Sequence, residues 1–193
     1  MAEAPASADT KARETPAQTR VRWALFLGLA AAVIVLDQLS KTWVDTSFEL
    51  ASRVTPAGEL GGPTEVIGEF VRIAKTYNDG AIFGFFDASA TLMAVLSLFV
   101  IGGITWYHWR FAAGLGPLVT VGLGLLLGGA VGNLIDRVRS GYVIDFVDMG
   151  VGDTRWYAWN ISDAAVFIGI VVLFLAALLG DRAIPGRRSG GAA

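Results

Sequence analysis

Four aspartates stand beside or inside the longest apolar stretches of this sequence. Asp37, Asp136 and Asp163 each lie near one end of such a stretch, and Asp145 follows in the short segment SGYVIDFVDMG. An ionisable side chain costs on the order of 2.5–3.5 kcal/mol at the centre of a membrane-spanning helix, and less near the interface. If the apolar stretches span a membrane, three helices place a carboxylate at the same depth, which indicates a functional cluster.

Each acid taken alone also has a purely structural interpretation. Asn160 or Asp163 can cap the helix that follows, because an acid in the first turn interacts favourably with the helix dipole. Asp136 is followed by Arg137, and the two can form a local ion pair at the interface. Each of these interpretations accounts for a single acid. None of them explains why several acids are predicted at the same depth in the membrane.

Paired carboxylates can hydrolyse a peptide bond without another reactive group. Two acids close together do not easily ionise at once, so they share a proton; one then acts as a base toward water while the other polarises a carbonyl. The residues alone leave open whether Asp136 or Asp145 is the partner of Asp163. A nucleophile made of Ser40 and Lys41 is not favoured, because adjacent residues on a helix point about 100° apart.

Composition excludes several other chemistries. The chain has no cysteine and one histidine, His108, which rules out a thiol nucleophile, a zinc–thiolate site and an HExxH metal motif. We therefore expect no metal site and no cofactor. The net charge of −2 does not favour a nucleic-acid partner.

The elements that must position these acids are predicted to be membrane helices. Of the 193 residues, 54% are hydrophobic and 17% are charged, with a mean hydropathy of +0.57. Soluble domains are about 45–50% apolar and about 25% charged. A helix needs about 20 apolar residues to cross the bilayer. Four segments meet this requirement: residues 23–44, 90–109, 111–135 and 161–179.

The remaining segments complete the predicted organisation. Residues 1–20 and 182–193 are polar and without periodicity, so we expect a disordered tail before, and a second tail after, a membrane domain that covers residues 21–181. Loops at 45–89 and 136–160 connect the spans on one side. The tails and the short connection on the other side carry an excess of basic residues, which predicts that both termini are cytoplasmic.

Both long loops contain strand-like patterns. EVIGEFVRIAKTYN places Val66, Phe70 and Ile73 among charged residues, and the segment around Asp145 favours a strand on the membrane surface. The predicted fold class is an α-helical integral membrane protein with four transmembrane helices, a small extracytoplasmic β-sheet region and an interfacial loop or helix.

Glycine recurs at every fourth position in the third predicted span. Gly124, Gly128 and Gly132 form the small-xxx-small pattern that lets helices approach closely in lipid. We expect this packing to bring Asp136 close to the first and fourth spans.

Four motifs, in the order of the spans, resemble those of lipoprotein signal peptidase, the bacterial signal peptidase II. Each motif alone is a weak signal, but together and in this order they are specific. The resemblance extends from about residue 23 to residue 180. The motifs are LDQLSK (Leu36 to Lys41), TYNDGAIFGFF (Thr76 to Phe86), GNLIDRVRSGYVIDFVD (Gly132 to Asp148) and WNISDAA (Trp159 to Ala165).

The resemblance implies an aspartic endopeptidase in the bacterial cytoplasmic membrane, with its active site near the extracytoplasmic face. Such enzymes remove the signal peptide from diacylglyceryl-modified prolipoproteins and cut just before the lipidated cysteine. The expected partners are therefore these substrates, whose acyl chains stay in the lipid, and membrane lipids. A monomer is the simplest assembly.

By position, the resemblance implies that Asp145 and Asp163 form the catalytic dyad. Asn133 and Asn160 then hold the carboxylates or the scissile peptide, since an amide both donates and accepts hydrogen bonds. Asn78, in a loop that reaches back to the site, is expected to bind the substrate backbone.

The resemblance also implies supporting roles for charged residues. Asp136 and Arg137 support the dyad, and Arg137 is expected to hold an acid or a loop by bidentate hydrogen bonds. Asp37 and Lys41 are expected to orient their neighbours or to shape the entrance.

Two positions depart from the family pattern. Ile82 and Ser162 both stand where alanine is common, and neither removes a catalytic group. Ile82 is expected to alter the packing of the Phe-rich segment Ile82 to Phe86, which is interpreted as a membrane-facing flap or as an interfacial anchor. Ser162 is expected to add a hydrogen bond near Asp163.

Two other classes of function remain as alternatives. Intramembrane acids also occur in small proton-coupled transporters, but there the sites tend to lie near the membrane midplane on broken helices. A structural scaffold is the third possibility, favoured only if the acids are individually dispensable.

Overall fold

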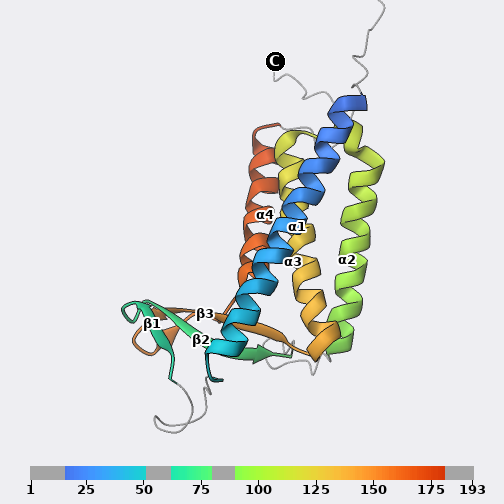
Figure 1. Ribbon diagram of the computed structural model, residues 1–193. Helices are drawn as coiled ribbons and strands as arrows, with labels where there is room; N and C mark the ends of the chain where they lie inside the picture. The colour runs from blue at the N-terminus through green and yellow to red at the C-terminus, as the bar shows by residue number, and fades with distance from the viewer. Residues whose placement is uncertain (1–15, 51–61, 80–89, 181–193) are drawn as a thin grey trace, which may run out of the picture.

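The computed structural model describes residues 16–50, 62–79 and 90–180, in which long helices form a bundle and a small sheet covers one end of it (Figure 1). The sheet lies where the first helix ends and the last one begins. The beginning of the first helix and the end of the last one lie at the opposite end of the bundle, away from the sheet (Figure 1).

Four helices within the described ranges are long and apolar enough to cross a membrane. Their outward surfaces expose large apolar side chains such as Phe99, Trp109 and Phe174, as expected where lipid replaces water as the solvent. The helices are α1 (Pro16–Ser47), α2 (Ala90–Phe111), α3 (Pro117–Ser140) and α4 (Ile161–Leu178).

Helix α1 begins earlier than the sequence predicts. Residues 16–20, assigned above to a disordered tail, are helical, and that part of the prediction is wrong. Pro16 is the first residue of the helix, where the fixed φ of proline suits a helix and its missing N–H costs no hydrogen bond. The rest of this tail, the tail at 182–193 and the segment Ile82 to Phe86 lie outside the described residues.

Helix α3 is displaced along the chain from its predicted position. It begins at Pro117 instead of residue 111, because a short 3-10 turn, η1 (Ala112–Gly114), and the N-cap Gly116 separate it from α2. It continues to Ser140, and Gly141 ends it with a left-handed φ of 81° that glycine adopts readily. Asp136, predicted to open a loop, therefore lies inside the helix.

The glycines of α3 allow close packing on two sides, as predicted from their spacing. A methyl group at Gly124 or Gly128 would press against the backbone and side chains of α1. At Gly132 it would collide with Ser162 Oγ of α4 and with a carboxylate oxygen of Asp37 on α1. The expectation that these glycines bring the acid-bearing end of α3 close to both helices is confirmed.

The sheet has the antiparallel order β1-β2-β3-β4 within the described residues. Its two central strands pair with Thr76 opposite Asp145 and with Val71 opposite Met149. The strand-like patterns in both loops are thus confirmed, except that Phe70 lies in the turn between the first two strands. The strands are β1 (Thr64–Ile67), β2 (Val71–Asn78), β3 (Val143–Val151) and β4 (Thr154–Arg155).

One face of this sheet continues outward from Asp145 as an apolar surface. Side chains alternate along a strand and cross-strand partners share a face, so the face of Asp145 is defined by the register. Its other members include Val147, Met149 and Val151 of β3, Ile73 and Val71 of β2, and Ile67 of β1.

Candidate active site

Asp145 and Asp163 come from different elements and are linked by amide side chains. Asp145 lies on β3 and is 3% exposed. Its carboxylate accepts hydrogen bonds from Asn160 Nδ2 at 2.7 Å and from Asn78 Nδ2 at 3.0 Å. Asp163 lies in the first turn of α4 and accepts one from Asn133 Nδ2 at 2.8 Å.

Asn160 caps α4 and also connects the two acids. Its Oδ1 accepts the backbone N–H of Asp163 at 3.0 Å, and Asp163 Oδ2 accepts the backbone N–H of Asn160 at 3.3 Å. This reciprocal pair is a capping box. Asn160 and Asp163 therefore cap the helix and also take part in the site. The capping box uses Asn160 Oδ1 and Asp163 Oδ2, so Asn160 Nδ2 remains to donate to Asp145 and Asp163 Oδ1 remains to accept from Asn133.

The position of Asp145 makes its protonated form unusually stable. Burial, followed by the negative charge of Asp163, raises the pKa of Asp145 to about 6. The hydrogen bonds from Asn78 and Asn160 and the charge of Lys41 oppose this rise without cancelling it. Asp145 can thus hold a proton at a pH where an exposed aspartate would have lost it.

A second cluster, of buried charged side chains, is connected to the two acids. Lys41 Nζ is 2.7 Å from Asp37 Oδ2 and 2.8 Å from Asp136 Oδ2, and it donates to Asn133 Oδ1 at 3.0 Å. Asp37 is 0% exposed and Lys41 is 2% exposed. Asp136, for which Arg137 was one expected partner, is instead paired with Lys41, and Asn133 connects this cluster to Asp163.

Arg137 does not take the role expected of it. Its Nη1 donates to the backbone carbonyl of Asn133 at 3.3 Å, while its buried Nε has no hydrogen-bond partner among the described residues. The predicted bidentate hydrogen bonding is not formed there, and Asp136 is paired with Lys41.

Two other expectations need correction. Asn78 is the last residue of β2, not part of a loop, and its side-chain amide is engaged by Asp145. The hydroxyl of Ser162 is buried and forms no hydrogen bond in the described part of the chain, because it faces Gly132, which offers it no side chain. Ser162 contributes through its backbone N–H, which donates to Asp37.

Gln38 also belongs to the site, although no role was predicted for it from the sequence. Its Nε2 donates to Asp136 Oδ1 at 2.9 Å and lies 3.2 Å from Asp37 Oδ2. Its position within LDQLSK, next to one of these acids and three residues before Lys41, was the available signal.

Another ionic cluster lies on the sheet, away from the two acids. Arg72 and Arg155 both hydrogen bond the carboxylate of Asp148, at 2.8 Å and 2.9 Å. Burial acts to raise the pKa of Asp148, but the hydrogen bonds from Arg155 and Arg72 outweigh it and leave the pKa below its usual value. This cluster joins β2, β3 and β4 and has no free acid for catalysis.

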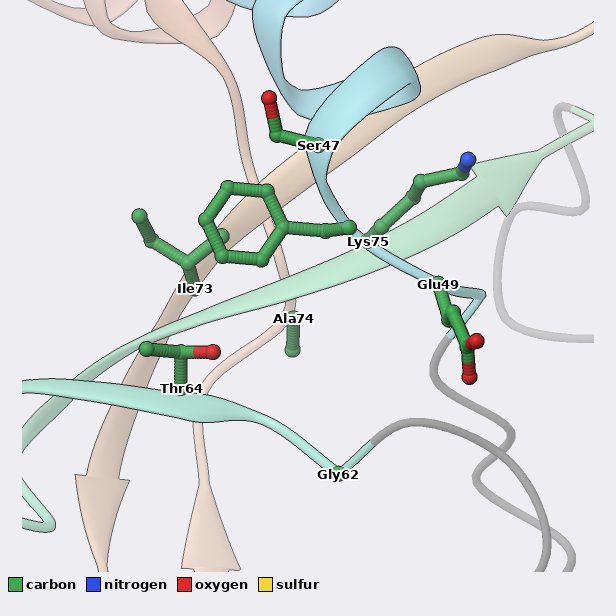
Figure 2. Close-up of a pocket in the computed structure, with 8 residues that line it drawn as sticks. Ser47, Glu49, Gly62, Thr64, Ile73, Ala74 and Lys75 are labelled. Carbon is green, nitrogen blue, oxygen red and sulfur yellow. The ribbon is translucent and has the colours of Figure 1, made fainter.

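A cleft of about 200 Å³ lies between the end of α1 and strands β1 and β2 (Figure 2). Its lining includes Ser47, Phe48, Thr64 and Ile73. Lys75 also lines it, but its Nζ is paired with Asp45 at 2.9 Å. None of the residues that hold Asp145 and Asp163 lines this cleft, so it is not the site of their chemistry.

The arrangement fits an acid–base hydrolase embedded in a membrane. One acid of the pair is buried and readily protonated, and the carboxylate of the other, in the first turn of a helix, accepts hydrogen bonds from Asn133 and from the backbone of Asn160. Within the described residues, no group of three or more His, Cys, Asp or Glu side chains is placed to hold a metal ion.

Comparison with known proteins identifies the family. A family model described as signal peptidase (SPase) II matches residues 29–179. The chain is 37% identical over 148 residues to a lipoprotein signal peptidase of Moorella thermoacetica, covering 77% of this chain and 89% of that protein. It is 36% identical over 155 residues to the lipoprotein signal peptidase of Syntrophomonas wolfei, covering 80% and 93%.

Solved structures agree with this assignment. Two structures of bacterial membrane enzymes, determined by the in meso method, superpose on the chain with TM-scores of 0.67 and 0.65, each at 26% identity. They cover 80% and 79% of this chain and 87% and 92% of their own chains.

The chain therefore belongs to the signal peptidase II family. It is a membrane-embedded bacterial protease, and the four-helix fold with a small sheet is confirmed.

Proposed function

We propose that this protein removes the signal peptide from diacylglyceryl-modified prolipoproteins, cutting just before the lipidated cysteine, with Asp145 and Asp163 as its catalytic pair. The observation that carries the proposal is the linkage of these two acids through Asn160 and Asn133, in a chain of this family.

The environments of the two acids suggest their separate roles. Asp145, with its pKa raised to about 6, holds the shared proton and donates it to the carbonyl oxygen of the scissile peptide. Asp163 accepts hydrogen bonds from Asn133 and from the backbone of Asn160, which orient its carboxylate, and it takes the role of the base that removes a proton from the attacking water. Collapse of the tetrahedral intermediate then breaks the C–N bond; the leaving amine takes a proton from Asp163, and a hydroxyl of the intermediate returns its proton to Asp145.

The supporting residues hold this pair in place. Asn78 and Asn160 fix the carboxylate of Asp145. Lys41, Asp37 and Asp136 form the buried ionic cluster behind the pair. Arg137 adds positive charge close to the site.

The apolar face of the sheet supplies a path for the substrate. It begins at Asp145 and continues outward to the exposed side chains Val151 and Ile67. An extended peptide on this face has its acyl chains in the adjoining lipid and its scissile bond at the pair.

We further propose that both termini are cytoplasmic, that the active site is near the extracytoplasmic face, and that the protein acts as a monomer. The excess of basic residues in the tails and in the adjoining ends of the helices, where Arg22 lies in α1 and Arg110 in the last turn of α2, supports this orientation.

The transporter alternative is not favoured by the positions of the acids. Asp163 is the third residue of α4, and Asp136 lies four residues before the end of α3. Both acids thus lie at one end of unbroken helices, whereas coupling sites of transporters tend to lie near the membrane midplane.

Cleavage of a synthetic diacylglyceryl-modified prolipoprotein peptide by the detergent-purified protein tests the proposal. Asp145→Asn and Asp163→Asn are expected to abolish cleavage, while Asp136→Asn retains some of it. The same peptide without the lipid is the substrate control and is expected to remain uncut. If the parent protein fails to cut, or if both dyad variants cut like the parent, the proposal is wrong.

A further inference from the structure

Two buried carboxylates each hold the backbone next to one of the paired acids. Asp37 Oδ1 accepts the N–H of Ser162, the residue before Asp163, at 2.9 Å. Asp136 Oδ2 accepts the N–H of Ile144, the residue before Asp145, at 3.4 Å. Each of these carboxylates therefore restrains the element on which one acid is carried.

Lys41 joins the two carboxylates to one another. Its ammonium group lies 2.7 Å from Asp37 Oδ2 and 2.8 Å from Asp136 Oδ2. Its third contact is with Asn133 Oδ1 at 3.0 Å, and Asn133 donates to Asp163. An ammonium group has three donors, so all three are used and the orientation of Lys41 is determined.

Gln38, one turn earlier on α1, ties the same two carboxylates a second time. Its Nε2 is 2.9 Å from Asp136 Oδ1 and 3.2 Å from Asp37 Oδ2, and it lies 3.3 Å from the carbonyl oxygen of Gly132. Gln38 and Lys41 thus hold both acids from one side of a single helix.

On the basis of the proposed function, we propose that Gln38 and Lys41 are positioning residues that set the separation of Asp145 and Asp163. The two paired acids lie on β3 and α4, which do not follow one another directly in the chain. Sharing one proton requires a defined distance between two carboxylates. The clamp formed by Gln38, Lys41, Asp37 and Asp136 connects the backbone of β3 to that of α4 through α1.

The test compares kcat and KM for the lipid-modified peptide in Gln38→Met and Lys41→Met. Methionine matches glutamine in side-chain length and is one atom shorter than lysine, and both substitutions remove the donors. We expect kcat to fall at least tenfold in Gln38→Met and at least a hundredfold in Lys41→Met, with KM within threefold of the parent. The side chains of both residues are engaged by Asp37 and Asp136, so we expect peptide binding to be retained while proton sharing is lost.

Thr42→Val is the matched control on the same helix turn. Thr42 is exposed and its hydroxyl donates to the carbonyl oxygen of Gln38 at 2.7 Å, within α1. Its kcat is expected to stay within twofold of the parent. Thermal unfolding in detergent is measured for every variant. Because Lys41→Met leaves two buried carboxylates without a counter-charge, Gln38→Met, which changes no charge, keeps the test decisive if the lysine variant does not fold.

Three results would overturn the proposal. They are a kcat within twofold of the parent in Gln38→Met, a loss confined to KM, and a loss of kcat in Gln38→Met that Thr42→Val reproduces. Failure of the proposed function is recognised separately, because then the parent does not cut or Asp145→Asn and Asp163→Asn remain active. If the parent cuts and those two variants do not, while Gln38→Met behaves as the parent, only the positioning role is lost.

Discussion

The two ends of the helix bundle bury polar groups in opposite ways. At the sheet end, Asp37, Lys41 and Asn160 are almost completely buried and each has several hydrogen-bond or ion-pair partners. At the other end, His108 is 0% exposed and both of its ring nitrogens lack a hydrogen-bond partner among the described residues. It is stacked on Phe26 at a centroid distance of 3.9 Å.

The far end is closed by aromatic packing and by one arginine. Trp23 meets His108 edge-on at 4.6 Å. Arg22 donates to the carbonyl oxygens of Ala112 and Ala113, at 2.9 Å and 2.7 Å, and so satisfies the turn between α2 and α3. The comparison shows that closing this bundle does not require a charged network. We therefore propose that the network at the sheet end serves catalysis.

The largest expected difference between the two ends is in activity. Asp163→Asn removes one member of the pair and is expected to lower kcat by about 10³-fold or more, as for catalytic groups that act as a unit. His108→Phe preserves the aromatic packing at the other end and is expected to leave kcat within about twofold. Cleavage of the lipid-modified peptide by the two purified variants measures both. A comparable loss in His108→Phe would show that the ends are not functionally separate.

Packing at the sheet end is expected to tolerate no additional atom in α3. In Gly132→Ala, the new methyl group meets Ser162 Oγ and Asp37 Oδ2, so we expect a loss of about 1–3 kcal/mol of stability and a fall in kcat. Gly103→Ala on α2 is the matched control, since no atom lies within 4 Å of a methyl group there. It should be neutral or stabilising, because alanine favours a helix more than glycine. Thermal unfolding of the two variants decides the matter.

The raised pKa of Asp145 predicts a pH-dependent contribution to stability. Its folded-state pKa of about 6 exceeds its ordinary value of 3.8, so the folded protein binds more protons than the unfolded chain between these two values. Stability from this group is fully present below about pH 3.8 and is lost as pH rises toward 6, by about 3 kcal/mol in total. In Asp145→Asn this component is absent. The difference in unfolding temperature between the parent and Asp145→Asn is therefore expected to change across this window, and a constant difference would contradict the shift.

The smallest effect is expected at Ser162. Its buried hydroxyl has no hydrogen-bond partner in the described residues, and an unsatisfied buried polar group costs about 1–3 kcal/mol. Ser162→Ala keeps the backbone N–H that donates to Asp37. We expect unchanged kcat and a stability gain of up to about 1 kcal/mol, measured by thermal unfolding. A destabilised variant would mean that the hydroxyl has a partner in the membrane.

Much of the fold followed from local patterns that do not depend on tertiary contacts. The apolar stretches predict membrane helices because the bilayer requires about 20 apolar residues per span. The alternation around Phe70 and Asp145 likewise predicts strands. The first and last residues of the helices were less predictable. Helices α1 and α3 begin at Pro16 and Pro117, and the sequence around each proline is compatible with several neighbouring start points.

The sequence predicted which residues form the candidate site better than it predicted their contacts. Asp145, Asp163, Asn133 and Asn160 were identified by motif, and the structure brings them together. The partner of Lys41 and the role of Gln38 were not predictable, because both depend on which face of α1 meets α3. The same holds for Arg137, whose Nη1 donates to a backbone carbonyl and not to an acid.

The sequence by itself determined that this protein resides in a membrane, that Asp136 and Asp163 lie near the ends of its predicted spans, and that thiol and multi-histidine metal chemistry are excluded. These conclusions depend on composition and on spacing along one chain. Only the tertiary structure decided that Asp37 and Asp136 hold the backbone beside Asp163 and Asp145, with Lys41 between them. Two of these contacts, between Asp37 and Ser162 and between Lys41 and Asp136, join residues far apart in the chain. They depend on the approach of helices, which the glycines of α3 permit but do not specify.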